Sequence, residues 1–167
     1  LQGDLLVSHG KIARIGRDIR HGDAQLIDAT GHYVMPGGVD VHTHLNLETG
    51  GVKVGDGFFE GTASAAFGGT TCVVEHPGFG PAGCSLLHQV KRYREEAAGR
   101  TIVDYGLHAV FQHVDKKILD EVADLAHEGV ATVKIYLTYD GRLNDLEMLK
   151  VLDRTRRLGL LAAFHAE

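Results

Sequence analysis

The sequence predicts an α/β protein of parallel strands joined by helices, and it favours the N-terminal portion of a TIM-type (β/α)8 barrel. From residue 38 onward, short apolar runs rich in β-branched residues alternate with amphipathic segments of helical length. Polar residues stand at the carboxyl ends of the predicted strands, where such barrels place their chemistry. An open doubly wound sheet begins in the same way, but no Gly-x-Gly-x-x-Gly follows the first strand, which disfavours a dinucleotide-binding fold.

Residues 1–36 are predicted to form part of a small β-sandwich domain. Short strand-like runs at residues 4–7, 11–15, 25–29 and 32–35 are separated by turns that contain glycine. Spacing of this kind is typical of a small antiparallel sheet or of half a sandwich. No residue pattern in this segment suggests catalysis.

Residues 37–167 are predicted to supply about five strands and four helices of the barrel. We expect the strands at residues 39–44, 70–75, 101–110, 131–137 and 160–165. We expect the helices at residues 58–67, 85–98, 115–127 and 145–158, with N-caps at Ser85, Asp115 and Asp145. The glycine-rich residues 45–57 are expected to form a loop after the first of these strands.

Composition excludes several classes of function. Hydrophobic residues make up 44% of the 167 residues, enough for a core, and the formal net charge of −5 comes without a basic run. Nucleic-acid binding through phosphates is therefore not expected. Cys72 and Cys84 form neither a disulfide framework nor a metal motif, which suits a reducing cytoplasm. No run approaches membrane-spanning length and no signal-peptide pattern begins the sequence, so we expect a cytoplasmic protein without a membrane partner.

The ends of the sequence suggest that it is part of a longer protein. It begins at Leu1 without a methionine. It stops at Glu167, just after the apolar run 160–164, where a strand is expected to deliver side chains to a site. We therefore expect further strands of the same barrel beyond Glu167.

The stretch Val39-Asp40-Val41-His42-Thr43-His44 contains the first candidate metal site. Successive strand residues point to opposite faces, so Asp40, His42 and His44 share one side. Two imidazoles at this spacing can direct ring nitrogens to one transition-metal ion. The alternative is a partly polar strand whose histidines are simply hydrogen-bonded.

Two further polar residues interrupt apolar strands. Lys134 lies within residues 132–137, and His165 closes residues 160–165. A buried lysine is costly unless it is neutral, paired or modified, although a lysine at a strand end can also extend its amine to solvent. Because His42, His44, Lys134 and His165 stand on three strands of one βα series, their convergence on a metal site is favoured over separate structural roles.

Several motifs, in order along nearly the whole chain, resemble the cyclic amidohydrolases of the hydantoinase and dihydropyrimidinase group. They are Pro36-Gly37-Gly38-Val39-Asp40-Val41-His42-Thr43-His44, Gly68-Gly69-Thr70-Thr71, Asp104-Tyr105-Gly106-Leu107-His108, Val133-Lys134-Ile135-Tyr136-Leu137-Thr138-Tyr139 and His165-Ala166-Glu167. Within that family, His42 to Leu47 and His76-Pro77-Gly78-Phe79-Gly80-Pro81 are most similar to the D-phenylhydantoinases.

The resemblance implies a TIM barrel with a β-sandwich flank and two divalent metal ions, usually zinc, bridged by a carboxylated lysine. It implies that His42 and His44 bind the first metal, that Lys134 as a carbamate bridges both, and that His165 binds the second. It also implies that Tyr139 hydrogen-bonds the substrate carbonyl; without the family motif, Tyr139 is simply a half-exposed loop residue. A further histidine ligand and a catalytic aspartate are implied beyond Glu167, and the family is typically tetrameric.

Residues around the pocket are assigned more loosely. Leu45, Leu47 and Leu143 occupy positions where hydantoinases line the pocket for the exocyclic substituent of the substrate, and ordinary loop packing is the alternative. Asp40 either orients a metal ligand or caps a backbone amide, and we favour the cap. Glu75 and His76 depart from the aspartate-led sequence more usual at that strand end, and His108 is expected to border the site.

We therefore predict a metal-dependent hydrolase that opens the ring amide of hydantoins or dihydropyrimidines to give N-carbamoyl amino acids, with residues 1–167 inactive alone. An allantoinase-type cyclic amidohydrolase is one alternative, although the Tyr139 motif is not usual there. A dihydroorotase is disfavoured because Asn46 stands where an arginine usually binds the substrate carboxylate. The other alternative is a non-enzymatic, dihydropyrimidinase-like scaffold protein, which would have lost metal ligands.

Overall fold

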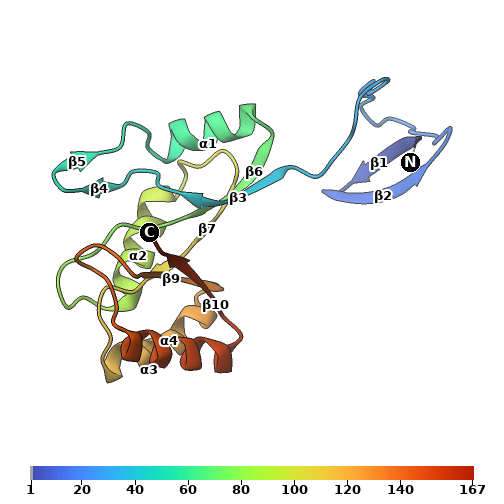
Figure 1. Cartoon of the computed structure of the whole chain (residues 1–167). Helices are drawn as coiled ribbons and strands as arrows, with labels where there is room; N and C mark the ends of the chain where they lie inside the picture. The colour runs from blue at the N-terminus through green and yellow to red at the C-terminus, as the bar shows by residue number, and fades with distance from the viewer. Residues whose placement is uncertain (1) are drawn as a thin grey trace. The chain divides into compact units, whose positions relative to one another are not determined.

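The chain forms two compact units in the computed structural model, which describes residues 2–167. The units are Leu1–Pro36 and Gly37–Glu167, and Figure 1 labels all of their helices and all of their strands except β8. The structure is mixed α/β throughout the second unit, as the sequence predicts. Among the residues described, no helix combines the length and the apolar character that crossing a membrane requires.

The first unit contains one antiparallel hairpin. Strand β1 (Asp4–Ser8) pairs with β2 (Lys11–Gly16). His9 and Gly10 connect them with φ values of 51° and 71°, the double positive φ of a tight turn that matches the twist of a hairpin.

The strands expected at residues 25–29 and 32–35 do not form in the described residues, so that prediction was wrong. A strand needs a neighbour for its backbone N–H and C=O groups, and β1 and β2 pair only with each other. Large apolar side chains in this stretch are exposed to solvent: Leu26, Ile27, Tyr33, Val34 and Met35.

The second unit has six strands of the predicted series and a small additional hairpin. The series consists of β3 (Gly38–Thr43), β6 (Thr70–Glu75), β7 (Asp104–Leu107), β8 (Ala109–Val110), β9 (Thr132–Tyr136) and β10 (Leu161–His165). The expected loop of residues 45–57 contains β4 (Glu48–Thr49) and β5 (Val52–Lys53), which pair antiparallel. The loop is therefore more ordered than the sequence suggested.

The six strands form two three-stranded parallel sheets, β3-β6-β7 and β8-β9-β10. The single strand expected over residues 101–110 is divided at His108, where pairing passes from β6 to β9. His108 N donates to Glu75 O at 2.9 Å, and Phe111 N donates to Lys134 O at 3.0 Å. Within each sheet, every strand thus lies beside the strand that precedes it in the chain, and a helix connects the two.

The four helices fall where they are expected, and most of their caps do too. They are α1 (Phe58–Phe67), α2 (Leu86–Ala97), α3 (Lys116–His127) and α4 (Asp145–Leu158). Ser85 accepts from Leu87 N, and Asp115 accepts from Ile118 N. The N-cap of α4 is Asn144 rather than Asp145, because Asn144 and Glu147 form a reciprocal capping box that places Asp145 inside the first turn.

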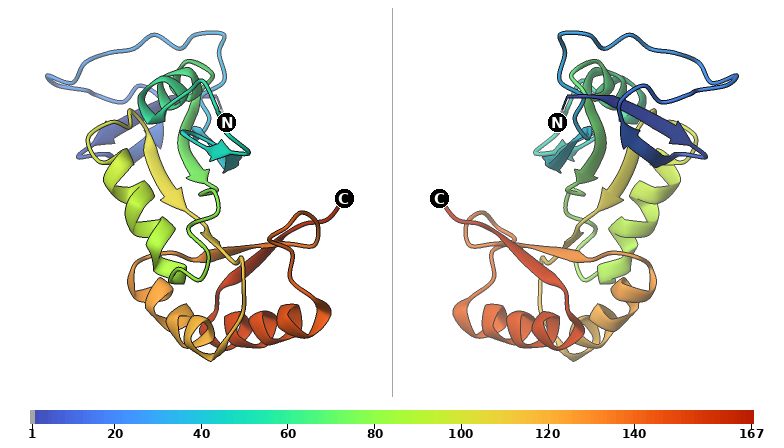
Figure 2. Two further views of the ribbon diagram at one scale, coloured as in Figure 1. Left: turned by 90° about the vertical axis from the view of Figure 1, so that its left-hand side faces the viewer. Right: turned by 90° about the vertical axis from the view of Figure 1, so that its right-hand side faces the viewer.

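The hydrophobic core lies in the second unit, where the helices cover the outer face of the strands (Figure 2). Tyr93 from α2, Leu125 from α3 and Val133 from β9 are among its fully buried members. Apolar side chains of the strands pack on the helices, whereas polar side chains lie at the carboxyl ends of the strands. The fold therefore gathers those side chains on one part of the second unit.

Candidate metal and active site

Side chains from strands far apart in the sequence share one cavity of about 510 Å³. Three of the four predicted metal ligands line it: His42 of β3, Lys134 of β9 and His165 of β10. The fourth, His44, lies directly after β3 against His42. The remaining lining residues are Val41, Val74, His76, His108, Thr132, Leu161, Ala163, Phe164, Ala166 and Glu167.

The rings of His42 and His44 turn their Nε2 atoms toward each other, 3.1 Å apart. Two imidazole nitrogens that ligate one tetrahedral zinc ion at about 2.0–2.1 Å are separated by roughly 3.3 Å, so the observed distance suits a shared cation. Burial lowers the pKa of both imidazoles, and the nearby Lys134 amine lowers both further. A lowered pKa favours the unprotonated ring nitrogen, which is the form that binds a metal.

Lys134 is buried in the middle of β9, with only 2% of its surface exposed. Val133 and Ile135 on either side are fully buried, and no carboxylate of the described residues forms an ion pair with the amine. Its Nζ lies 5.5 Å from the centroid of the Tyr136 ring. Burial lowers the pKa of this amine, because the apolar surroundings disfavour its charged form.

His165 and Tyr139 lie together at the end of β10. The Tyr139 hydroxyl is 3.4 Å from His165 Nε2, which is 2.9 Å from Glu167 Oε1, and the hydroxyl also donates to Glu167. Tyr139 has a φ of 65°, in the left-handed region that a bulky residue enters at a cost of order 1 kcal/mol. A strained backbone at Tyr139 is consistent with a functional role for its side chain.

Two buried residues at the end of β6, Glu75 and His76, lie against the predicted ligands and were not assigned roles. They are 0% and 1% exposed, and burial raises the pKa of Glu75 to about 7 and lowers that of His76 to about 2. The signal in the sequence was a polar pair directly after the apolar run Thr70–Val74. His108 borders the cavity, as expected.

The leucines predicted to face the substrate pack against the protein instead of lining this cavity. Leu143 is 5% exposed within the core, and Leu45 packs against that core. Leu47 lies against Gly78, where a Cβ atom would collide with it. Their contact with a substrate stays a prediction. Asp40 accepts a hydrogen bond from His42 N at 3.0 Å, the local cap that we favoured.

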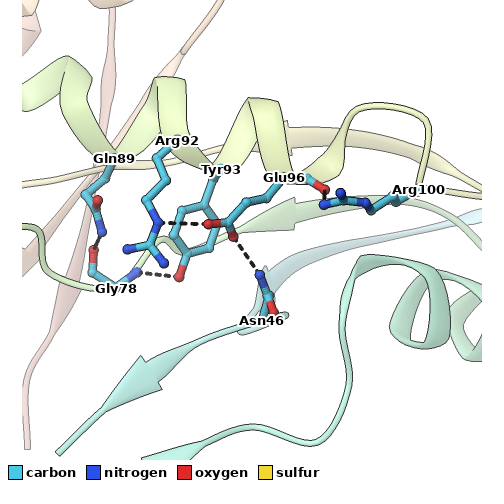
Figure 3. A network of polar contacts seen from close by, with 7 residues as sticks. All are labelled: Asn46, Gly78, Gln89, Arg92, Tyr93, Glu96 and Arg100. Carbon is cyan, nitrogen blue, oxygen red and sulfur yellow. Dashed lines mark hydrogen bonds and ion pairs between the residues drawn. The ribbon is translucent and has the colours of Figure 1, made fainter. Parts of the chain in front are cut away.

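Helix α2 holds the loops that follow β3 and β6 (Figure 3). The Tyr93 hydroxyl accepts from Gly78 N at 3.1 Å, and Gln89 Nε2 donates to Gly78 O at 2.7 Å. Asn46 Nδ2 donates to Glu96 Oε2 at 2.6 Å, and Arg92 pairs with Glu96 at 2.8 Å. The side chain of Asn46 is therefore engaged by α2 and is not among the residues that line the cavity.

The side chains present fit a divalent metal ion only if the histidine nitrogens are combined with a modified Lys134. Within residues 2–167, no three histidine, cysteine, aspartate or glutamate side chains are grouped so that they alone could hold an ion. The paired Nε2 atoms and the buried, unpaired Lys134 supply what such a group lacks, provided that the amine is converted to an anion. The ligand roles of the four residues stay predictions.

Comparison with known proteins finds extensive likeness along the chain. It is 48% identical to a D-phenylhydantoinase of Escherichia coli O9:H4 (strain HS), over 98% of this chain and 36% of that protein. The dihydropyrimidinase of Brevibacillus agri NCHU1002 superposes with a TM-score of 0.95 at 38% identity, over 99% of this chain and 36% of that one. A D-hydantoinase from Bacillus sp. AR9 gives a TM-score of 0.94 at 36% identity, over 99% and 37%.

No family model matches the chain. The fold and the polar cavity at the strand ends define an α/β protein of the type found in the N-terminal part of hydantoinase structures. The resemblance to the hydantoinase and dihydropyrimidinase group is thereby confirmed. The chain spans little more than a third of the length of the relatives it matches.

Proposed function

We propose that a full-length protein containing this chain is a metal-dependent cyclic amide hydrolase that opens hydantoins or dihydropyrimidines to N-carbamoyl amino acids. The observation that carries the proposal is the meeting of His42, Lys134 and His165, from three separate strands, in one cavity. The relatives named D-phenylhydantoinase, D-hydantoinase and dihydropyrimidinase support the substrate class. The architecture proposed is a TIM barrel, begun by residues 37–167, flanked by a β-sandwich that includes residues 1–36.

Lys134 is proposed to carry a carbamate. The ammonium first loses one proton. The neutral amine then attacks the carbon of carbon dioxide, so that an N–C bond forms while one C=O π bond becomes a C–O⁻ bond, and a second proton leaves the nitrogen for solvent; a buried cation thereby becomes an anion. The lowered pKa of the amine supports this step because only the neutral amine is a nucleophile. The carbamate would help to hold two divalent ions, zinc by the resemblance, with His42 and His44 as further ligands for one and His165 for the other.

The metal pair, when bound, lowers the pKa of water to about 7 and polarises the ring carbonyl. Tyr139 is proposed to donate its hydroxyl proton as a hydrogen bond to the carbonyl oxygen and so to stabilise the oxyanion. Its position beside His165 supports this role. A further histidine and the proton-transferring aspartate are proposed to lie after Glu167.

The test measures metal and turnover in the full-length protein. We expect about two zinc ions per chain, conversion of 5-phenylhydantoin or dihydrouracil to its N-carbamoyl product, and loss of both with a chelator. His42→Ala and Lys134→Ala should abolish turnover, whereas His88→Ala, on the exposed side of α2, should not. Peptide mass mapping should find the carbamate mass on Lys134 under neutral conditions and not after acid treatment.

Two results would overturn the proposal. A protein that binds no metal supports the dihydropyrimidinase-like scaffold, and one that hydrolyses allantoin but not hydantoins supports the allantoinase alternative. Residues 1–167 alone should hydrolyse hydantoin no faster than buffer, because the proposed aspartate is absent. The full-length protein is further proposed to be a cytoplasmic homotetramer, which gel filtration with light scattering would test.

A further inference from the structure

The end of β6 carries two buried polar groups that the proposed reaction does not use. Glu75 and His76 are at most 1% exposed, and neither belongs to the predicted ligand set. Burying a carboxyl group and an imidazole costs several kcal/mol unless other contacts offset it. The contacts of these two side chains show which neighbouring residues they hold in place.

Glu75 contacts Thr43, the last residue of β3 and the chain neighbour of His44. The Thr43 hydroxyl donates to Glu75 Oε2 at 2.7 Å, and His76 N donates to Thr43 O at 2.9 Å. Since Thr43 directly precedes His44, the carboxyl group restrains the backbone on that side of the imidazole.

His76 fills the space between two other imidazoles. Its ring stacks on His108, with centroids 3.9 Å apart, and lies 4.1 Å from the ring of His42. His108 is held at both nitrogens, by Val41 O at 3.0 Å and by Thr132 Oγ1 at 2.6 Å. The rings of His108, His76 and His42 therefore form a stack. At one end, both nitrogens of His108 are hydrogen-bonded, which fixes the orientation of its ring; His42 lies at the other end.

The stack matters because His42 has few other restraints. His42 is exposed, and the hydrogen bond recorded for its ring in residues 2–167 is the one to His44. Neither ring nitrogen of His76 has a hydrogen-bond partner in the described protein. His76 therefore acts on its neighbours through the faces of its ring.

We propose that Glu75 and His76 are positioning residues for His42 and His44. The carboxyl group holds Thr43, which directly precedes His44, and the imidazole fixes the ring plane of His42. The proposal rests on the proposed function, in which these histidines hold a metal. Groups that orient metal ligands typically change metal affinity by about 10–100-fold when they are removed.

The first test uses zinc affinity, measured in the full-length protein by competition with a chromophoric chelator. His76→Ala removes the stacked ring and is expected to weaken zinc binding at least about 10-fold. His76→Phe keeps a flat ring and is expected to stay within about threefold of the wild type. His88→Ala serves as the control, because His88 is exposed on α2.

The second test addresses the carboxyl group in the same way. Glu75→Ala removes the acceptor for the Thr43 hydroxyl and is expected to weaken zinc binding about 10-fold. Glu75→Gln keeps an acceptor oxygen of the same reach and is expected to stay within about threefold. Melting of each apo-protein, recorded in parallel, separates a loss of positioning from a loss of folding. If His76→Ala does not fold, His76→Leu, which fills the space without a flat ring, is expected to show the same weakening.

The outcomes separate this inference from the proposed function. A wild-type protein that binds no zinc overturns the proposed function itself. Wild-type zinc binding with equal affinity in folded His76→Ala and Glu75→Ala overturns the positioning role and leaves the function standing. Equal weakening by His76→Phe and His76→Ala overturns the stacking account, because it assigns the role to the ring nitrogens.

Discussion

The two units of the chain use apolar residues in different ways. In Leu1–Pro36, large apolar side chains such as Tyr33, 94% exposed, face solvent, whereas the buried apolar residues of the described chain all lie in Gly37–Glu167. The second unit has helices that cover its strands, and the first has a single hairpin. Apolar sequence is therefore not sufficient for burial, because a core needs a second layer.

The largest effect should come from truncating the core of the second unit. Leu125→Ala, at a fully buried position of α3, is expected to lower the free energy of unfolding by about 2–5 kcal/mol through lost transfer energy and a cavity. Ile12→Ala, at a position 63% exposed on β2, should change it by less than about 0.5 kcal/mol. Urea unfolding of residues 1–167 measures both. Equal losses would show that the two units are packed alike.

A buried acid should make the stability of the second unit depend on pH. Because burial raises the pKa of Glu75 from 4.5 to about 7, folding favours its protonated form, and stability falls as pH rises from 4.5 through about 7. A shift of this size corresponds to about 3 kcal/mol.

Glu75→Gln removes this titration. We therefore expect the variant to gain stability over the wild type by up to about 3 kcal/mol between pH 4.5 and pH 8. Asp23→Asn, an exposed change in the first unit, should show no such gain. Unfolding of metal-free protein at several pH values measures the difference, and a constant difference would contradict the prediction.

A smaller effect should come from the cap of α4. Asn144→Ala removes the hydrogen bond to Glu147 N at 3.0 Å and is expected to cost about 1 kcal/mol. Asp145→Ala, in the first turn, loses a helix-dipole interaction and should cost about 0.3 kcal/mol. Thermal melts of both variants decide which residue caps the helix. A larger loss for Asp145→Ala would restore the prediction made from sequence.

The smallest effect should come from the exposed apolar segment of the first unit. Ile27→Ser, at a position 79% exposed, is expected to change the stability of residues 1–167 by less than about 0.5 kcal/mol. The same substitution in the full-length protein should cost more if this segment is covered by the rest of the proposed sandwich. Denaturant unfolding of the two proteins side by side makes the comparison.

Local patterns predicted most of the second unit. Helices α1 to α4 follow the apolar periodicity and the glycines after them, and β6 follows the β-branched run after Gly69. The spacing of His42 and His44 was sufficient to predict that their nitrogens meet, because it is set by strand geometry over three residues.

Other features could not be predicted from local patterns. The break at His108 arises because its two sides pair with different strands, β6 and β9. The strands expected at residues 25–35 do not form for the same kind of reason. A strand requires a pairing partner, and the sequence of this segment does not specify one.

The sequence by itself determined where the four helices lie, and which face of a strand its polar residues occupy. Those properties depend on residues within a few positions of one another. The tertiary structure alone decided that Glu75 is buried against Thr43, that His76 is buried against His42 and His44, and that Lys134 and His165 share a cavity with His42. Burial and pairing depend on contacts between segments distant in the chain, such as Thr43 with Glu75, 32 residues away.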